Sequence, residues 1–383
     1  MAGLAIIAGR SNEGLSRSIA ARLNLELTPV IIDCYSSGES RVEILHSVRN
    51  QVVFIVQSGY TYEEGSPSPN DYIMETIMLA DACFHASAQS IYLLMPCLPY
   101  CNSAEENGFG EPIDIESIEC GNDLEKWLKE SLFNIVPEKV DDPALYEQLK
   151  KHHESVPKPI FHPIAPMVQT DPLKLVAKLL TCSGISKLLT FALPRPQLVG
   201  YFDIPVDDLS VAPVLSCFLR TKGSTKRSTK NYTVATSDLE LAKSASHIAK
   251  ALNFPFTFSS KLPGQDEFYF SGENLEGKDI LLVDGIGKQA FEAAEAFKQK
   301  SCSSVSLLVV HLLLDSPSSD ISYFKDNSNV FDEIFITNSN RIPEEILKCT
   351  NVQVVDLAEY FAEAIKCIVN GDSLKELQNN LLK

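Results

Sequence analysis

The stretch LAIIAGRSNEGLSRSIAARLNLELTPVII (residues 4–32) decides the fold class. It begins with a four-residue apolar run typical of a strand, continues with Leu15, Ile19 and Leu23 at helical spacing, and ends with a β-branched run at residues 30–32. The order strand, helix, strand indicates an α/β fold. Such folds have mostly parallel sheets, so we expect these strands to lie in one.

The same alternation continues along the chain. Helices are predicted around residues 73–78 and 172–180. Further strands of the first α/β unit are predicted at residues 52–56, 91–95 and 187–192. Strands of a second unit are predicted at residues 232–235, 280–283, 305–310, 335–337 and 354–355.

The composition excludes several classes of partner. The chain has 383 residues, of which 50 are acidic and 33 basic, and its formal net charge is −17. This charge repels nucleic acid and anionic membrane surfaces. No run approaches the roughly 18 apolar residues of a membrane span, and the ten cysteines form no Cys-x-x-Cys pair. We therefore expect a cytoplasmic protein without a nucleic acid partner, a membrane segment, a disulfide framework or a zinc ribbon.

The alternation breaks between about residues 101 and 166, in a polar, acidic insertion. Within it, an apolar face is predicted for one helix, formed by Leu124, Trp127, Leu128 and Leu132. This face could pack on its own domain or bind a partner, and the sequence leaves both interpretations open. A basic link at residues 222–230 precedes the second unit.

Several short segments are more specific than a general α/β pattern. They are Ala8–Ser11, Tyr35–Glu39, Ile55–Gly59, Asn70–Asp71, Met95–Tyr100 and Gly200–Leu209. In order and spacing they resemble the ribose-phosphate diphosphokinases, or PRPP synthetases. The resemblance covers nearly the whole chain apart from the insertion and the basic link.

The resemblance implies two phosphoribosyltransferase-like (type I) domains related by pseudo-twofold symmetry. Their expected limits are 1–206, including the insertion, and 207–371, with a tail at 372–383 that returns to the N-terminal domain. Active members of the family use magnesium and ATP, transfer the β,γ-diphosphoryl group to the 1-hydroxyl of ribose 5-phosphate, and assemble into dimers and higher oligomers.

The residues expected to bind ATP and metal are largely replaced. The Arg-Gln-Asp run of the family becomes the start of the insertion, residues 101–104, without the guanidinium and the carboxylate. The metal-binding Asp-Leu-His becomes Ala192–Pro194, whose side chains cannot ligate magnesium. Asp203 and Asp207 remain as vestigial metal positions that could hold a weakly bound, mostly hydrated magnesium, although retention for the fold is the favoured explanation.

The sugar-phosphate loops are also rewritten. In the ribose 5-phosphate segment Asp238 stays while two glycines are lost, and in the PRPP loop, residues 284–292, only Asp284 of an acidic pair survives. Phe291 is expected to fill the space that a glycine leaves for the 5-phosphate. Lys288 could still hold an anion at this strand-to-helix junction, or the junction could be a plain turn.

Two further segments complete the comparison. The mobile catalytic loop, expected at residues 259–267, keeps one lysine beside two acids, which is a poor phosphate clamp. Tyr35 and Glu39 keep positions that lie near the nucleotide base in the family. Vestigial ligand positions are therefore Tyr35, Glu39, Asp238, Asp284 and Lys288, and no intact catalytic residue is expected.

The sequence predicts a non-catalytic or regulatory subunit, a pseudoenzyme that requires no cofactor itself. Its expected partners are catalytic PRPP synthetase subunits in a hetero-oligomer, and self-association is compatible with the resemblance. Two alternatives stay open: an active ribose-phosphate diphosphokinase, and an independent sensor of nucleotides or sugar phosphates.

Overall fold

The computed structural model describes residues 3–63, 65–101, 172–223, 232–261, 267–271 and 274–382. The acidic insertion, its predicted amphipathic helix and most of the basic link lie outside the described residues. No helix in the described part of the chain combines the length and the apolar character that crossing a bilayer requires.

The first sheet is entirely parallel, as the alternating pattern predicts. Its strand order is β1-β4-β5-β6-β7, and every neighbouring pair is parallel. The strands are β1 (Gly3–Ala8), β4 (Gln51–Val56), β5 (Ser90–Leu94), β6 (Lys187–Phe191) and β7 (Val206–Leu209). β5 and β6 are adjacent in space although the insertion separates them in sequence.

One predicted strand does not belong to this sheet. The run at residues 30–32 lies in β2 (Val30–Cys34), which pairs antiparallel with β3 (Ser40–Ile44) in a separate two-stranded hairpin. The expectation that it lies in the parallel sheet was wrong. Short-range periodicity identifies a strand but carries no information about its partner.

The second sheet has seven strands in the order β10-β9-β8-β11-β12-β13-β14. Only the edge pair β9–β10 is antiparallel. The strands are β8 (Tyr232–Thr236), β9 (Phe256–Lys261), β10 (Phe268–Ser271), β11 (Asp279–Val283), β12 (Ser304–Val309), β13 (Glu333–Thr337) and β14 (Val352–Val355). All five strands predicted for this unit are confirmed, whereas β9 and β10 were not anticipated.

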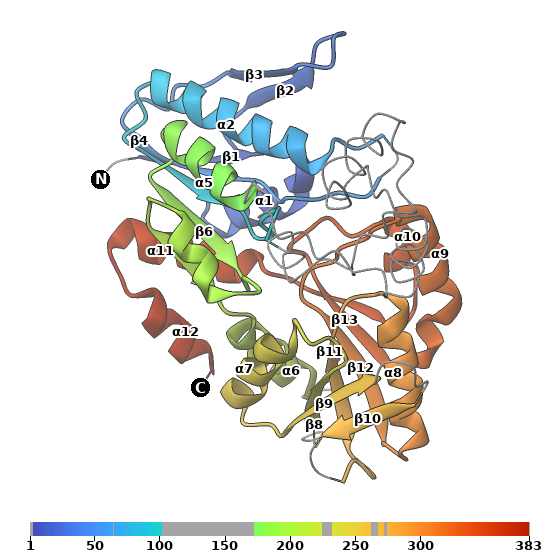
Figure 1. Cartoon of the computed structure of the whole chain (residues 1–383). Helices are drawn as coiled ribbons and strands as arrows, with labels where there is room; N and C mark the ends of the chain where they lie inside the picture. Colours follow the sequence, from blue (N-terminus) through green and yellow to red (C-terminus); the bar gives the residue numbers. More distant parts are fainter. Residues whose placement is uncertain are drawn as a thin grey trace, which may run out of the picture. The chain divides into compact units, whose positions relative to one another are not determined.

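Helices cover both faces of each sheet (Figure 1). They are α1 (Glu13–Arg22), α2 (Pro69–His85), α5 (Pro172–Cys182), α6 (Val211–Gly223), α7 (Ala242–Leu252), α8 (Lys288–Gln299), α9 (Pro317–Asn327), α10 (Glu344–Leu347), α11 (Ala358–Asn370) and α12 (Leu374–Leu382). Short 3-10 helices span Arg10–Asn12, Pro196–Tyr201 and Ser328–Val330. The longest helix, α2, begins with a capping box between Ser68 and Asp71, and Pro69 follows the cap.

Alternation along each strand divides the apolar side chains between separate cores. In β1, Ile7 packs under α2 and α5, whereas Ile6 faces a core shared by both sheets. That shared core contains apolar residues of α1, α6, α7 and α11 together with residues of β8 and β11. A third core lies under α8 and α9 on the far face of the second sheet.

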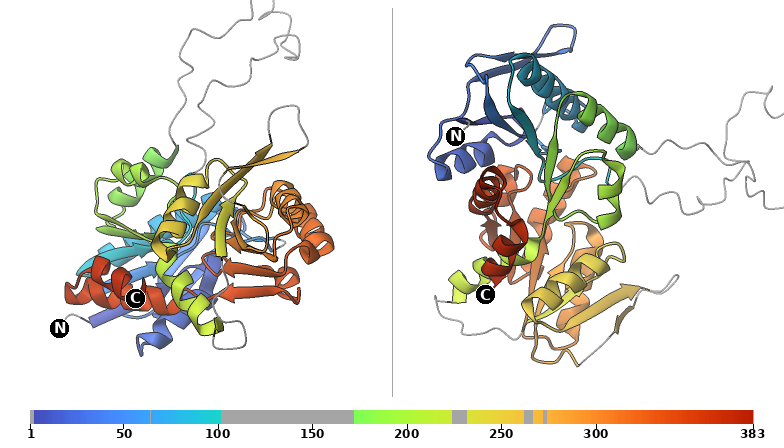
Figure 2. Two further views of the ribbon diagram at one scale, coloured as in Figure 1. Left: turned by 90° about the horizontal axis from the view of Figure 1, so that it is seen from below. Right: turned by 90° about the vertical axis from the view of Figure 1, so that its left-hand side faces the viewer.

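The C-terminal helices close the shared core. α11 contacts α1 near the N-terminus, and α12 contacts α6 and α11 (Figure 2). Arg220 of α6 donates to the carbonyl of Leu381 at 2.9 Å, so the last turn of α12 is anchored.

A buried polar network follows the carboxyl ends of β1 and β4. Arg10 Nε donates to Glu75 Oε1 at 2.9 Å, and Glu75 is completely buried in α2. Gln57 Nε2 donates to the other oxygen of Glu75 at 3.3 Å, while its own Oε1 accepts from the backbone and hydroxyl of Ser11. The network continues to the second sheet, because Ser58 Oγ donates to the carbonyl of Ser339 at 2.6 Å.

Glycine is required beside this network. A Cβ atom at Gly9 would overlap Gln57 Oε1, and a Cβ atom at Gly59 would lie 2.6 Å from the carbonyl oxygen of Cys97. Both contacts are shorter than any real Cβ contact. The backbone at Gly9 and Gly59 can therefore lie this close to its neighbours only because glycine has no side chain.

Removing Arg10 should destabilise the protein strongly. Arg10→Ala leaves the Glu75 carboxylate buried without its counter-charge, and we expect a loss of about 3–5 kcal/mol in the free energy of unfolding, measured by urea denaturation. The matched control is Arg17→Ala, which removes an exposed pair with Glu13 within α1 and should cost less than about 1 kcal/mol.

A second substitution tests the cause. In the Arg10→Ala background, Glu75→Gln removes the unpaired charge and should recover part of the lost stability. Equal losses in Arg10→Ala and Arg17→Ala would contradict the importance of the network.

Candidate functional site

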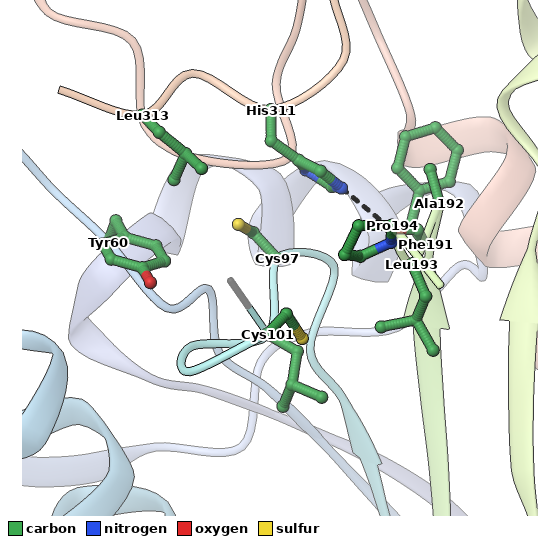
Figure 3. A pocket seen from close by; sticks show the side chains of 10 residues that line it. Tyr60, Cys97, Cys101, Phe191, Ala192, Leu193, Pro194, His311 and Leu313 are labelled. Carbon is green, nitrogen blue, oxygen red and sulfur yellow. Dashed lines mark hydrogen bonds between the residues drawn. The ribbon is translucent and has the colours of Figure 1, made fainter. Parts of the chain in front are cut away.

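The carboxyl ends of β5, β6 and β12 meet around a small cavity (Figure 3). Its volume is about 30 Å³, which accommodates water and not a nucleotide. The lining residues are Tyr60, Cys97, Leu98, Cys101, Phe191, Ala192, Leu193, Pro194, His311 and Leu313. The cavity therefore brings together the start of the predicted ATP segment and the whole predicted metal segment.

The cavity lining carries no charge at neutral pH. None of its side chains is a carboxylate, a lysine or an arginine. Burial lowers the pKa of His311 to about 4 and raises the pKa of Cys97 to about 12, so both are neutral. Burial also raises the pKa of Tyr60 and Cys101. These groups cannot offset the charge of a metal–polyphosphate complex.

His311 links the two sheets at this cavity. Its Nε2 lies 2.9 Å from the carbonyl oxygen of Phe191, at the end of β6, and its Nδ1 lies 2.9 Å from the hydroxyl of Ser339, which follows β13. A carbonyl oxygen only accepts, so Nε2 must carry the proton and Nδ1 must accept from Ser339. The ring also stands edge-to-face with Phe191, at 5.8 Å between centroids.

The turn after β6 is held in an unusual conformation. Ala192 has a φ of 52°, in the left-handed region, which is unfavourable for alanine. Asp208 in β7 accepts a hydrogen bond from the backbone of Leu193 at 3.1 Å. Burial raises the pKa of Asp208 to about 6, so this carboxylate has little contact with water.

The two aspartates predicted as vestigial metal positions have different surroundings. Asp207 accepts from Lys187 Nζ at 2.8 Å, and both side chains are partly buried. Asp203 is exposed. Within the described ranges, no group of three or more histidine, cysteine, aspartate or glutamate side chains could hold a metal ion. The assignment of metal to these positions stays a prediction.

A second cluster lies at the carboxyl ends of β8 and β11, which are adjacent parallel strands. Asp284 Oδ2 accepts from the backbone of Ser237 at 3.0 Å and from its hydroxyl. Gln289 Nε2 donates to the carbonyl oxygen of Ser237 at 2.6 Å. Asp238 follows Ser237 directly, so the structure brings the two predicted sugar-phosphate positions, Asp238 and Asp284, together.

Burial, aided by the nearby Asp238, raises the pKa of Asp284 to about 6. The hydrogen bonds from Ser237 act in the opposite direction, because they stabilise the ionised form. The balance leaves Asp284 partly protonated near pH 6.

Phe291 does not occupy the loop, contrary to expectation. Its ring is 2% exposed and lies edge-to-face against Tyr323 and Phe331, with centroids 5.2 Å apart in both pairs. The helical rotation of α8 turns this side chain into the core under α9. The expectation that Phe291 fills the space for the 5-phosphate was therefore wrong.

The expected catalytic loop is partly a strand. Ser259, Ser260 and Lys261 belong to β9, and residues 262–266 lie outside the described residues. Lys261 Nζ donates to Glu292 Oε2 at 2.6 Å, and Lys288 Nζ lies 3.5 Å from Glu292 Oε1. Both lysines near the loop thus share one carboxylate.

Tyr35 and Glu39 lie on the turn of the β2–β3 hairpin. Both are exposed, and the backbone of Tyr35 donates to the carbonyl oxygen of Glu39 at 2.8 Å. The Glu39 side chain accepts from the hydroxyl of Ser37 at 2.7 Å. Neither residue lines the cavity after β5 and β6.

Comparison with known proteins identifies both halves of the chain. Residues 4–119 match the family model described as the N-terminal domain of ribose phosphate pyrophosphokinase, and residues 230–379 match the model described as the phosphoribosyl synthetase-associated domain. The chain belongs to the ribose-phosphate diphosphokinase family.

One solved structure supports the fold of this family. The crystal structure of phosphoribosylpyrophosphate synthetase from Mycobacterium smegmatis matches 96% of this chain and 99% of its own, with a TM-score of 0.68 and 21% identity. An adenine phosphoribosyltransferase from Thermoanaerobacter pseudethanolicus matches 40% of this chain and 89% of its own at 12% identity, but its TM-score of 0.21 carries no weight.

The predicted fold class is confirmed: the ribose-phosphate diphosphokinase fold here is α/β, with mostly parallel sheets in two phosphoribosyltransferase-like domains. The domain limits at 206/207 and 371/372 stay predictions. β7, at residues 206–209, pairs with β6 of the first sheet.

Three site residues of this family member were not found by sequence reasoning. Glu75 and Asp208 carry no local signal, because an acidic residue in a helix or strand is usually solvated. His311 follows a predicted strand, and a polar side chain at the carboxyl end of a parallel strand is a signal that could have identified it.

The buried Asp284 should make stability depend on pH. The pKa of Asp284 is about 6 in the folded state and about 3.9 in the unfolded state. The folded state therefore binds the proton more tightly. As a result, the free energy of unfolding falls as the pH rises from about 4 to about 6. Asp284→Asn should reduce this fall by roughly 2 kcal/mol, measured as the free energy of unfolding at several pH values.

Asparagine has nearly the same shape as aspartate, and its side-chain oxygen can still accept the two hydrogen bonds from Ser237. The control is Asp203→Asn, which removes an exposed carboxylate in place of the buried one. A profile of Asp284→Asn parallel to that of the unmodified chain would show that burial does not perturb this group.

The left-handed turn at Ala192 gives a further prediction. Ala192→Gly removes the cost of the left-handed conformation in the folded state, but it also increases the conformational entropy of the unfolded chain. Because these effects oppose each other, the free energy of unfolding should stay within about 1 kcal/mol of that of the unmodified chain. Ala192→Val introduces a β-branched residue at positive φ and should destabilise by about 1–2 kcal/mol more than Ala192→Gly in thermal unfolding. Equal stability of the two variants would argue against the left-handed conformation.

Proposed function

We propose that this chain is a non-catalytic, regulatory subunit of a ribose-phosphate diphosphokinase complex, contributing to the formation of 5-phosphoribosyl diphosphate through its partners. The observation that carries the proposal is the uncharged cavity after β5 and β6. Diphosphoryl transfer is accelerated mainly by charges placed around the phosphates. The metal segment at residues 192–194 provides apolar side chains instead, and His311, which faces it across the cavity, is neutral.

The remaining cations near the loops support the same proposal. Lys261 and Lys288 share Glu292, and Lys187 pairs with Asp207. A lysine that already has an internal partner must lose that interaction before it can stabilise a transferring phosphate. The surviving lysines are therefore poorly placed to replace the missing groups.

The retained segments support a structural role. Residues 8–11 and 55–59 supply the polar network and the close backbone approach that join the two sheets. Their retention is explained by the fold, without any requirement for turnover. A subunit that offers family surfaces to catalytic subunits needs this scaffold and nothing more.

The proposal assigns ATP and magnesium to the catalytic partners, with no cofactor required by this chain. It places the complex in the cytoplasm. Two alternatives remain if the test below contradicts the proposal. The chain would then be an active enzyme, or an independent sensor that uses Asp238, Asp284 and Lys288.

The test is PRPP formation from ATP and ribose 5-phosphate with magnesium. The purified chain alone should give no turnover above a blank reaction. Mixed with an active synthetase subunit from the same cells, it should co-elute in size-exclusion chromatography and change the turnover per active subunit. Robust activity of the isolated chain that Asp238→Ala abolishes would establish an active enzyme instead.

A double substitution sharpens this test. Ala192→Asp with Pro194→His restores the side chains that the family uses for metal, and aspartate tolerates the left-handed φ of position 192. We expect no turnover from this variant, because the charged run after β5 is still missing. Recovery of activity would mean that the loss at this one turn accounts for the inactivity.

The sensor alternative has its own readout. Binding of ATP or ribose 5-phosphate to the isolated chain, measured by calorimetry with a Kd of about 1 mM or tighter, would support it. Absence of binding together with co-elution would favour the regulatory subunit.

A further inference from the structure

Two neighbouring helices, α2 and α5, cover the same face of the first sheet. They lie side by side in Figures 1 and 2, and Gly184, just after α5, lies against the side chain of Phe84 near the end of α2. Their inward side chains, among them Leu79 and Leu180, are completely buried in one core. The opposite sides of both helices face away from this core.

Large apolar side chains are exposed on these outer sides. Met74 and Phe84 of α2 are 51% and 61% exposed, and Leu175 and Leu179 of α5 are 56% and 43% exposed. Among the helices that the structure describes, each of the others exposes at most one large apolar side chain. Single exposed apolar residues are ordinary, whereas a group of them with a polar rim is typical of a protein interface.

The rim of this group carries charges of both signs. Lys174 and Lys178 lie four residues apart on the exposed side of α5, each next to one of the leucines. α5 contains no acidic residue. Asp81 is exposed in the second half of α2. The rim is therefore basic on α5 and has an acidic group on α2.

We propose that the α2–α5 face, formed by Met74, Phe84, Leu175 and Leu179, is the contact between two copies of this chain related by a twofold axis. An axis that passes between the two helices sets α5 of each protomer against α2 of its partner. The apolar side chains then pack at the centre of the contact. This inference is independent of the proposed regulatory function, because it concerns the chain without any other subunit.

The distribution of charge favours a second copy as the occupant. In the twofold arrangement the lysines of α5 lie opposite the acidic group of α2 from the other copy, so the face is complementary to itself. The formal net charge of −17 makes two copies repel each other over most of their surfaces. The lysines of α5 place positive charge at the contact and reduce that repulsion locally.

The size of the face is also suitable. α2 and α5 contain 17 and 11 residues, and two adjacent helices of this length present a face roughly 25 Å long and 20 Å wide. A protein interface of standard size buries about 800 Å² on each partner. The two helices alone supply about half of that area in projection, which is enough for the centre of a dimer interface.

The test is sedimentation velocity of the purified full chain over a range of protein concentrations. The unmodified chain should sediment as a dimer. Leu179→Glu introduces a charge at the apolar centre, twice in a symmetric dimer, and should raise the dimer Kd by about tenfold or more. The matched control is Leu347→Glu on α10, where the leucine is 45% exposed, and it should leave the Kd unchanged.

Two results would overturn the proposal: a monomeric unmodified chain, or equal Kd values for the Leu179→Glu and Leu347→Glu variants. Suppose that the chain alone is monomeric, and that an active synthetase subunit binds it but fails to bind Leu179→Glu. The face would then belong to that partner, and the contact between two copies would be refuted while the proposed regulatory function is kept.

Exchanging the rim charges tests the twofold arrangement. Lys178→Glu and Asp81→Lys should each raise the Kd, because each places like charges opposite one another. Both substitutions in one chain should return the Kd towards its original value, since opposite charges meet again. Absence of this recovery would rule out the twofold contact. Circular dichroism checks the folding of every variant, and the exchange, which uses two exposed positions, decides the question if Leu179→Glu does not fold.

Discussion

The buried pair of Arg10 and Glu75 is the interaction on which the arrangement of the first sheet depends. A completely buried carboxylate is tolerated only with a counter-charge and hydrogen bonds. Gln57 and Ser11 supply those bonds, and Ser58 carries the network to the second sheet. The network therefore ties the segments that follow β1 and β4 to α2 and to the segment after β13.

His311 provides a second set of hydrogen bonds between the two sheets, at the cavity. As a neutral ring it can donate from one nitrogen and accept at the other, and it uses both to join β6 to the segment after β13. A charged histidine could not accept from Ser339. The neutral state of His311 is therefore part of what holds the two sheets together.

The cations of the chain are consistently used for internal pairing near the rewritten loops. Lys187 forms an ion pair with Asp207, and Lys261 and Lys288 form ion pairs with Glu292. In an active diphosphokinase such groups would be directed at the transferring phosphates. These described lysines therefore each have a carboxylate partner within the chain.

The sequence by itself determined the α/β class, most strands and the family, because apolar periodicity and short specific segments are local properties. The resemblance also singled out Asp238 and Asp284, and the structure shows that they follow adjacent strands. Only the tertiary structure decided that residues 30–32 pair in a hairpin, that Phe291 turns into the core and that Glu292 bridges two lysines. Each of these features depends on contacts between segments that are distant in sequence. Such contacts are decided by the direction and burial of the side chains, which residue type alone does not give.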